Sequence, residues 1–270
     1  MADSDTISSL GGALFLGVIQ GLTEFLPVSS SGHLVLFQQF IDIGNDEVLF
    51  DLVLHVGTLI PVLWFYRSWV GKLALDPIVG EGPLLERTGV RWLGLLILAS
   101  VPTAAIGLGL EDMFEALFST PATLAITFTI TGLLLLATRR FDHSDRSVPL
   151  TWRIALVLGI AQGLAITPGI SRSGTTIAVA LFLGLERETA ARFSFLMSVP
   201  AISGGLLLKL RSADLAALDA GQLSIGGIAA LLTGYVALTL LVRVVRAGFL
   251  SAFAWYMFAI AGFALSLALS

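Results

Sequence analysis

The sequence predicts an all-α integral membrane protein with six transmembrane helices and two re-entrant helix-loop-helix segments, arranged as an inverted-topology repeat of two halves. Three observations lead to this fold class: an apolar composition, six long apolar segments, and an interrupted apolar segment that occurs twice. Of the 270 residues, 56% are hydrophobic and 13% are charged, and the mean hydropathy is +0.92. A soluble domain carries about 25% charged residues, so this chain cannot cover a water-facing surface of ordinary size. The absence of cysteine excludes disulfides and thiolate metal sites.

Six uninterrupted segments are each predicted to form one transmembrane helix. A helix needs roughly 20 predominantly apolar residues to cross the hydrocarbon core of a bilayer. The segments that come close to this length are Val48–Tyr66, Trp92–Leu110, Ala122–Thr138, Phe193–Leu210, Ile225–Val242 and Ser251–Leu269.

Two further apolar stretches, Leu10–Phe40 and Ile154–Leu185, are interrupted in the middle. The interruptions, Pro27–Gly32 and Pro168–Gly174, are rich in glycine, proline and serine, which a straight helix does not tolerate. We therefore predict two half-helices joined by a buried loop in each stretch. Irregular backbone survives at membrane depth only where protein or a wet cavity satisfies its polar groups.

The two interrupted stretches are copies of each other, because identical residues recur 142 positions apart without a gap. The matched residues Gly17, Gln20, Gly21, Leu22, Ser29, Ser31 and Gly32 recur as Gly159, Gln162, Gly163, Leu164, Ser171, Ser173 and Gly174. The chain is therefore expected to be a single membrane domain, 1–270, built from related halves near 1–140 and 150–270.

Charge asymmetry predicts a multi-pass protein of the plasma membrane with both termini outside. If each interrupted stretch leaves on the face where it entered, most of the 15 basic residues, including Arg139 and Arg140, fall on one side. The other side keeps Lys209 and Arg211. The positive-inside rule makes the first side cytoplasmic, which gives the halves opposite topology. Inverted repeats of this kind place their site near the midplane, where the broken helices meet.

The interruptions carry ionisable groups, which inside a membrane segment indicate function. Glu24 and His33 flank the first interruption, and Arg172 lies in the second. The arginine offers a planar fork suited to phosphate, and the nearby glycines and serines let backbone N–H groups approach an anion. Glu24 fits a metal ligand or a base, and His33 with a nearby serine fits nucleophile-and-base chemistry, with either as nucleophile. An ion pair between Glu24 and Arg172 that bridges the halves is compatible with such a site.

These motifs resemble those of the undecaprenyl-diphosphate phosphatase family, the membrane enzymes linked to bacitracin resistance. The resemblance rests on Gln20-x-x-x-Glu24, Pro27–His33, Pro168–Thr176 and Phe193–Pro200, and it spans nearly the whole chain. It implies hydrolysis of a polyprenyl diphosphate to the monophosphate and inorganic phosphate, with a divalent cation, Mg²⁺ or Ca²⁺, as cofactor. It also implies a site that opens to the outer face.

The resemblance assigns roles to individual residues. The implied catalytic residues are Ser30, His33, Glu24 and Arg172, and the implied metal ligands are Glu24 and Gln20. The expected substrate-binding residues are Ser29, Ser31, Gly32, Gly169, Ser171, Ser173, Gly174 and Thr176. We favour Ser30 as nucleophile with His33 as its base, while a phosphohistidine intermediate stays open. Gln20 stands where the family often has a carboxylate.

One alternative function, the expected role of His55 and the expected partners complete the predictions. A transporter or flippase for a lipid phosphate would use the same inverted-repeat cavity, although it would not need the Ser30–His33 pair. His55 is expected to be a packing or cavity residue rather than a catalytic one. The expected partners are the polyprenyl diphosphate and membrane lipids, without nucleic acid, and a homodimer is possible.

Overall fold

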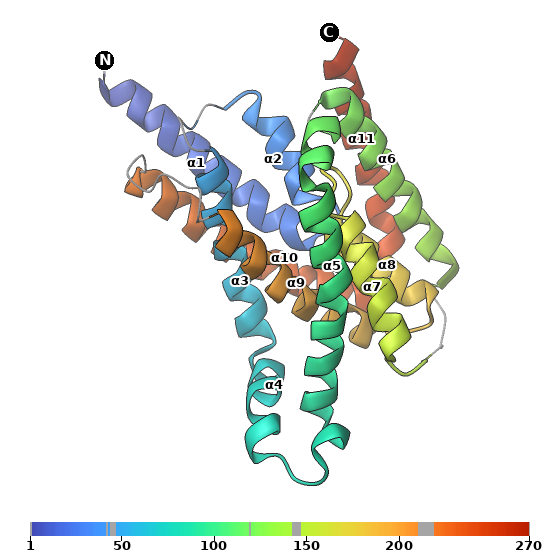
Figure 1. The fold of residues 1–270 in the computed structure, drawn as a ribbon. Coiled ribbons are helices and arrows are strands. Elements are labelled where there is room, and N and C mark those ends of the chain that lie inside the picture. The colour runs from blue at the N-terminus through green and yellow to red at the C-terminus, as the bar shows by residue number, and fades with distance from the viewer. Residues whose placement is uncertain are drawn as a thin grey trace.

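The computed structural model describes residues 2–41, 43, 47–118, 120–141, 147–209 and 219–269, and these residues are helical almost throughout (Figure 1). Within these ranges no strand forms, and only one isolated bridge joins Val148 to Leu185. The α-helices are α1 Ala2–Phe25, α2 Ser30–Gln38, α3 Glu47–Phe65, α4 Arg67–Val79, α5 Thr88–Phe118, α6 Pro121–Ala137, α7 Trp152–Leu164, α8 Arg172–Phe182, α9 Arg187–Lys209, α10 Ala220–Ala247 and α11 Phe253–Leu269. The 3-10 turns are η1 Leu84–Glu86, η2 Thr138–Phe141 and η4 Leu250–Ala252.

The helices have the lengths and composition of a multi-pass membrane protein. Among the described residues, five helices are long and apolar enough to cross a bilayer, or six if the bent pair α3–α4 counts as one span. The five are α5, α6, α9, α10 and α11, and each overlaps one predicted segment, of which Leu210 lies outside the described residues. The predicted segment Val48–Tyr66 coincides with α3 and ends where the chain turns by 76° into α4.

Both predicted interruptions break the helices. The helix α1 ends at Phe25 and α2 begins at Ser30, while α7 ends at Leu164 and α8 begins at Arg172. A seryl side chain caps each new helix, which satisfies one of the backbone N–H groups left open at a helix start.

Each broken segment folds back on itself as a helical hairpin. The ring of Phe37 near the end of α2 lies 5.5 Å from the ring of Phe15 in α1. The backbone N–H of Val148, just before α7, donates to the carbonyl of Gly184, just after α8, at 2.9 Å. The end of α2 therefore lies beside the middle of α1, whereas the two ends of the second hairpin lie close together, and both turns are largely buried.

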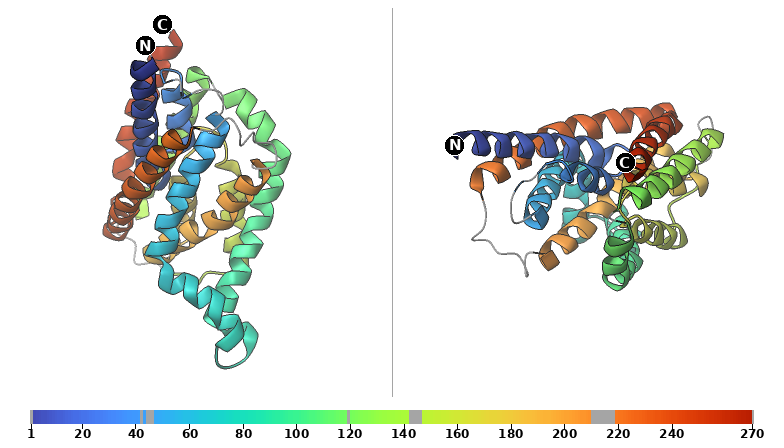
Figure 2. Two further views of the ribbon diagram at one scale, coloured as in Figure 1. Left: turned by 90° about the vertical axis from the view of Figure 1, so that its left-hand side faces the viewer. Right: turned by 90° about the horizontal axis from the view of Figure 1, so that it is seen from above.

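The first helix of each hairpin packs closely against a long neighbouring helix. The helix α1 lies along α10, and α7 lies along α5 (Figure 2). A Cβ atom on Gly17 would lie 2.8 Å from Gly226 Cα, and one on Gly159 would lie 2.8 Å from the carbonyl carbon of Ala99. The hydroxyl of Thr103 donates to the carbonyl of Gly159 at 2.8 Å. Small residues and interhelical hydrogen bonds of this kind hold helices together where apolar burial gives little driving force.

The main hydrophobic core surrounds the turns of both hairpins. Phe25 and Val28 border the first break, and Ile177 lies in α8 one turn beyond the second. Phe128 of α6 belongs to the same core and has no exposed surface. This dense packing fixes the positions of the polar residues in both breaks.

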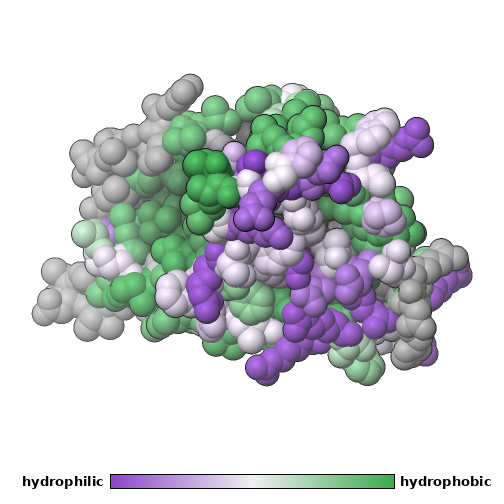
Figure 3. All heavy atoms as spheres, turned by 90° about the horizontal axis from the view of Figure 1, so that it is seen from below, coloured by the Kyte–Doolittle hydropathy of each residue, from purple (hydrophilic) through white to green (hydrophobic). Residues whose placement is uncertain are grey.

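One end of the molecule carries many hydrophilic side chains. The start of α1 and the end of α11 lie at one end, while α4 and η1 lie at the other (Figures 1 and 2). Hydrophilic side chains gather over the second end (Figure 3). Arg211 lies outside the described residues, and the side chain of Lys209 is not described.

Candidate active site

The two hairpin turns touch in the middle of the molecule. A Cβ atom on Gly32 would lie 2.8 Å from Gly169 Cα and 2.6 Å from the ring of Phe128. Gly169 also has a φ of +85°, in the left-handed region that favours glycine. Thr131 of α6 holds the second turn, because its hydroxyl donates to the carbonyl of Gly169 at 3.0 Å and accepts from the N–H of Ser171 at 3.1 Å. Gly32 is therefore needed for the close approach of the turns, and Gly169 is needed for its positive φ and for the space beside Thr127.

The turns begin α2 and α8 in the same way. Ser29 Oγ accepts from the N–H of Gly32 at 3.3 Å, and Ser171 Oγ accepts from the N–H of Gly174 at 3.0 Å. In both turns the capping hydroxyl lies 3.4 Å from the hydroxyl of the serine two positions later. Two helix N-termini, which carry partial positive charge, therefore start near the centre of the molecule.

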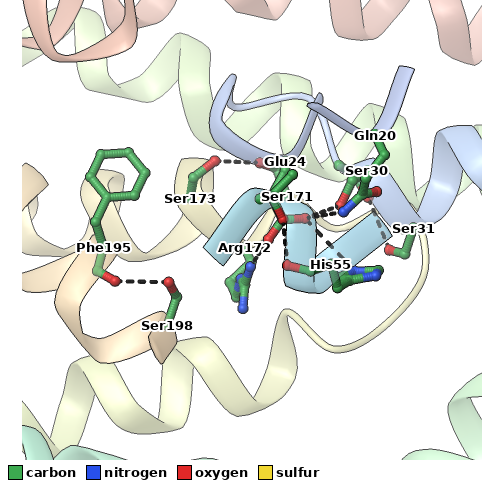
Figure 4. A network of polar contacts seen from close by, with 12 residues as sticks. Gln20, Glu24, Ser30, Ser31, His55, Ser171, Arg172, Ser173, Phe195 and Ser198 are labelled. Carbon is green, nitrogen blue, oxygen red and sulfur yellow. Dashed lines mark hydrogen bonds and ion pairs between the residues drawn. The ribbon is translucent and has the colours of Figure 1, made fainter. Parts of the chain in front are cut away.

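A buried carboxylate joins the two turns (Figure 4). Ser30 Oγ donates to Glu24 Oε2 at 2.6 Å, and Gln20 Nε2 donates to the same oxygen at 3.1 Å. The Arg172 guanidinium pairs with Glu24 Oε1, so the ion pair that the sequence offered only as an alternative is present between the halves. The side chain of Glu24 is 3% exposed and that of Arg172 is 22% exposed. The Ser30 hydroxyl, the Glu24 carboxylate and the Arg172 guanidinium thus meet at one point, and the Arg172 side chain is more exposed than that of Glu24.

His55 of α3 belongs to this cluster, although sequence reasoning left it out of the catalytic set. Its Nε2 lies 3.8 Å from Glu24 Oε2. Its Nδ1 lies 2.7 Å from the carbonyl oxygen of Asp51, and since a carbonyl only accepts, Nδ1 carries the proton of that bond. Gln38 Nε2 in turn donates to Asp51 Oδ1 at 2.8 Å. The available signal was an ionisable residue inside an apolar segment, the same signal that singled out Glu24.

His33 lies apart from the cluster. It is fully buried, with Nδ1 2.7 Å from the carbonyl oxygen of Ser29 and Nε2 2.8 Å from the hydroxyl of Tyr256. Nδ1–H therefore donates to Ser29, and Nε2 accepts from Tyr256. Because both ring nitrogens are bonded elsewhere, the structure does not bring His33 and Ser30 together as a base and its nucleophile. Ser30 is instead bonded to Glu24.

The remaining predicted substrate-binding side chains mostly bond to backbone. Ser173 Oγ donates to the carbonyl of Leu26 at 3.2 Å, which ties the second turn to the first. Thr176 Oγ1 donates to the carbonyl of Arg172 at 2.9 Å within α8. Ser31 is half-buried beside the capping hydroxyl of Ser29. Ser173 and Thr176 therefore shape the turns, and Ser31 offers a partly accessible hydroxyl.

Comparison with known protein families gives a match that includes both turns. A family model described as "Bacitracin resistance protein BacA" matches residues 13–263, which include both hairpins and the whole polar cluster. The chain belongs to the BacA family.

Curated relatives support this membership along nearly the whole chain. A protein of Carboxydothermus hydrogenoformans named undecaprenyl-diphosphatase is 46% identical over 251 residues, covering 91% of this chain and 92% of the relative. A protein of Desulfatibacillum aliphaticivorans with the same name is 44% identical, covering 90% and 93%. A third, of Halothermothrix orenii, is 42% identical, covering 90% and 92%.

The polar cluster of this BacA-family chain offers oxygen donors for a cation without forming a complete cage. Gln20 Oε1 is buried and has no hydrogen-bond partner among the described residues, next to the Glu24 carboxylate. In the part of the chain that the structure describes, no group of three His, Asp or Glu side chains could hold a metal. These donors fit a hard cation that takes most of its ligands from substrate phosphates and water, as Mg²⁺ commonly does.

Proposed function

We propose that this chain hydrolyses undecaprenyl diphosphate to undecaprenyl phosphate and inorganic phosphate, and so returns the lipid carrier to cell-wall synthesis. The observation that carries the proposal is the contact of the Ser30 hydroxyl with the Glu24 carboxylate, whose other oxygen faces Arg172. This arrangement brings together a nucleophile, its base and a guanidinium group that can bind phosphate. The named relatives are all undecaprenyl-diphosphatases, which supports the enzyme over the transporter alternative.

The first chemical step forms a phosphoserine. Ser30 Oγ attacks the terminal phosphorus while Glu24 accepts the hydroxyl proton across the 2.6 Å hydrogen bond. The bond between that phosphorus and the bridging oxygen breaks, and undecaprenyl phosphate leaves. Arg172 and the N-termini of α2 and α8 stabilise the negative charge that moves onto the phosphoryl and leaving oxygens.

The second step restores the enzyme. A water molecule attacks the phosphorus of the phosphoserine, and its oxygen becomes part of the inorganic phosphate that leaves. Ser30 recovers a proton as the Oγ–P bond breaks, so one water is consumed in each cycle. Glu24, which holds the proton taken from Ser30, returns it to Ser30 Oγ, and the two protons of the attacking water leave with the inorganic phosphate.

Substrate binding exchanges the partners of Arg172 and Glu24. Without substrate, Arg172 neutralises the buried Glu24 carboxylate. A diphosphate carries more negative charge than one carboxylate and presents the paired oxygens that a guanidinium binds best. Arg172 would therefore turn to the diphosphate, and Glu24 with Gln20 Oε1 would be the residues that hold a divalent cation. Such a cation would supply charge neutralisation of the diphosphate.

Phosphate release tests the proposed function directly. Purified protein in detergent is given undecaprenyl diphosphate or, as a control, undecaprenyl phosphate, and inorganic phosphate is measured over time. We expect release from the diphosphate alone. Absence of release from the diphosphate, in the presence of Mg²⁺ or Ca²⁺, would contradict the proposal.

Chelation is expected to lower activity, because the cluster has one carboxylate and a diphosphate needs further neutralisation. We expect EDTA to reduce phosphate release by roughly a hundredfold, with recovery when Mg²⁺ or Ca²⁺ is restored. Gln20→Glu adds a second carboxylate and should lower the cation concentration needed for half-maximal activity. Full activity in EDTA would reject the metal role of Glu24, and an unchanged half-maximal cation concentration in Gln20→Glu would reject that of Gln20.

The membrane arrangement that best suits this site is an inverted repeat with two re-entrant hairpins in one domain, with halves near 1–140 and 150–270. It is supported by the matched breaks, by the paired capping serines, and by the packing of α1 along α10 and of α7 along α5, which joins one half to the other in both cases. The contact of Phe37 with Phe15 and the hydrogen bond from Val148 to Gly184 are the contacts that re-entrant hairpins would make. A homodimer stays a prediction.

The orientation that we propose places both termini and the mouth of the site outside the plasma membrane. It is supported by the shared position of the termini and by the hydrophilic end around α4 and η1 (Figure 3). The chain has no cysteine, so single cysteines at Ala2 and Glu81 report their side cleanly. A membrane-impermeant thiol reagent on intact cells should label the first and not the second, and the reverse would overturn the orientation.

A further inference from the structure

The residue before the proposed nucleophile has an unusual backbone. Ser29 has a φ of 68°, and among the described residues it is the one non-glycine residue with a positive φ. A serine in this region is unfavourable and persists only where its surroundings hold it, commonly at functional sites. The direction of the next side chain, Ser30, depends on this conformation because it begins α2.

A histidine and a tyrosine hold the Ser29 backbone. His33 Nδ1 donates to the carbonyl oxygen of Ser29 at 2.7 Å, and the hydroxyl of Tyr256 donates to His33 Nε2 at 2.8 Å. The two rings are stacked at 5.8 Å with an angle of 9° between their planes. Since Tyr256 lies in α11, the last helix of the chain fixes the turn between the first two.

The His33 ring is enclosed by other aromatic rings. The ring of Phe128 lies 5.4 Å away and that of Phe37 lies 6.3 Å away. His33 has no exposed surface, so it cannot touch a substrate without leaving this enclosure. Its geometry suits a residue that holds backbone rather than one that contacts the reacting phosphate.

The second turn offers an internal comparison. Its capping residue Ser171 makes the same hydrogen bond to its helix as Ser29 does, yet its φ is −72°. The position that matches His33 is Thr175, whose buried hydroxyl has no hydrogen-bond partner in the described part of the chain. The strained backbone and its histidine therefore occur together, in the turn that carries Ser30.

We propose that Tyr256 and His33 are positioning residues that hold the Ser29 backbone in its left-handed conformation and thereby aim the Ser30 hydroxyl at Glu24. Tyr256 acts through His33, and His33 acts through the carbonyl of Ser29. The inference rests on the proposed phosphatase activity, in which Ser30 is the nucleophile.

The first test removes the tyrosine hydroxyl and keeps its ring. Tyr256→Phe is expected to lower kcat for undecaprenyl diphosphate by about tenfold with KM unchanged. The Ser30 hydroxyl loses its orientation toward Glu24, while the groups that bind the substrate stay in place. The matched control is Tyr235→Phe, which removes a hydroxyl from the exposed side of α10 and should keep wild-type values. Thermal unfolding midpoints close to that of the wild type confirm that both variants are folded.

The second test separates positioning from chemistry at His33. His33→Asn keeps an N–H donor close to the position of Nδ1 but has no imidazole, whereas His33→Ala keeps neither. We expect His33→Asn to retain at least about ten times more kcat than His33→Ala. Tyr256→Phe should have no further effect in the His33→Ala background, since its effect passes through the histidine.

Two outcomes would overturn the proposal while wild-type phosphate release stands. One is a Tyr256→Phe variant with the same kcat as wild type. The other is a His33→Asn variant as inactive as His33→Ala, which would assign the chemistry to the imidazole itself. A wild-type protein that releases no phosphate would instead contradict the proposed function, so the two failures are distinguishable.

Discussion

Arg172→Lys is expected to lower kcat/KM for undecaprenyl diphosphate by roughly a hundredfold or more. Lysine keeps the positive charge but loses the planar fork that binds two phosphate oxygens at once. It also forms a single contact where the guanidinium now neutralises Glu24. The loss should appear in both kcat and KM, because Arg172 faces the diphosphate in the ground state and in the transition state.

The matched control for this variant is Arg153→Lys. Arg153 is exposed near the start of α7, over the ring of Trp152. Its replacement by lysine makes the same chemical change outside the site. Wild-type kcat/KM in Arg172→Lys would contradict the assigned role.

Arg172→Ala should in addition destabilise the protein. Removing one partner of a buried ion pair costs about 3–5 kcal/mol, and the lower end applies here because the Arg172 side chain is 22% exposed. A lower thermal unfolding midpoint checks this loss, and Glu24→Gln in the same background should restore part of it by removing the uncompensated charge.

The broad fold could be predicted from the sequence because the membrane imposes simple rules. Long apolar segments must be helical, and a Pro- and Gly-rich interruption must break the helix. Both breaks, and the helices that cover the six apolar segments, follow from these rules. The 76° bend after α3 does not, because the apolar run simply gives way to a more polar helix at Tyr66, and no residue there marks the angle.

The site could be predicted only as far as residue type and proximity reach. The repeat placed the two turns together, so the Glu24–Arg172 pair could be named as an alternative to direct phosphate binding by Arg172. The partner of Ser30 was not, because its direction depends on a positive φ at Ser29 that the sequence of a serine-rich turn does not reveal. The partner of His33 was not foreseeable either, since Tyr256 lies in the last helix, far along the chain.

Ser30→Ala is expected to abolish phosphate release almost completely, with a fall in kcat of roughly ten-thousandfold or more, as for other enzymes that lose their nucleophile. The side chain is small and half-buried, so the fold should be unaffected. Ser224→Ala, at an exposed serine of α10, is the matched control and should keep wild-type kcat.

The same variant identifies the nucleophile when the phosphoenzyme is trapped. Undecaprenyl diphosphate labelled in its terminal phosphate should leave label on the protein after a rapid quench, and Ser30→Ala should remove it. Phosphoserine survives acid, whereas phosphohistidine is lost in acid, so an acid-stable label points to Ser30. An acid-labile label that persists in Ser30→Ala and disappears in His33→Asn would place the intermediate on His33. That result would require the imidazole to leave the enclosure formed by Tyr256 and Phe128 during each turnover. An acid-stable label instead lets the enclosure stay closed, with Glu24 as the base beside Ser30.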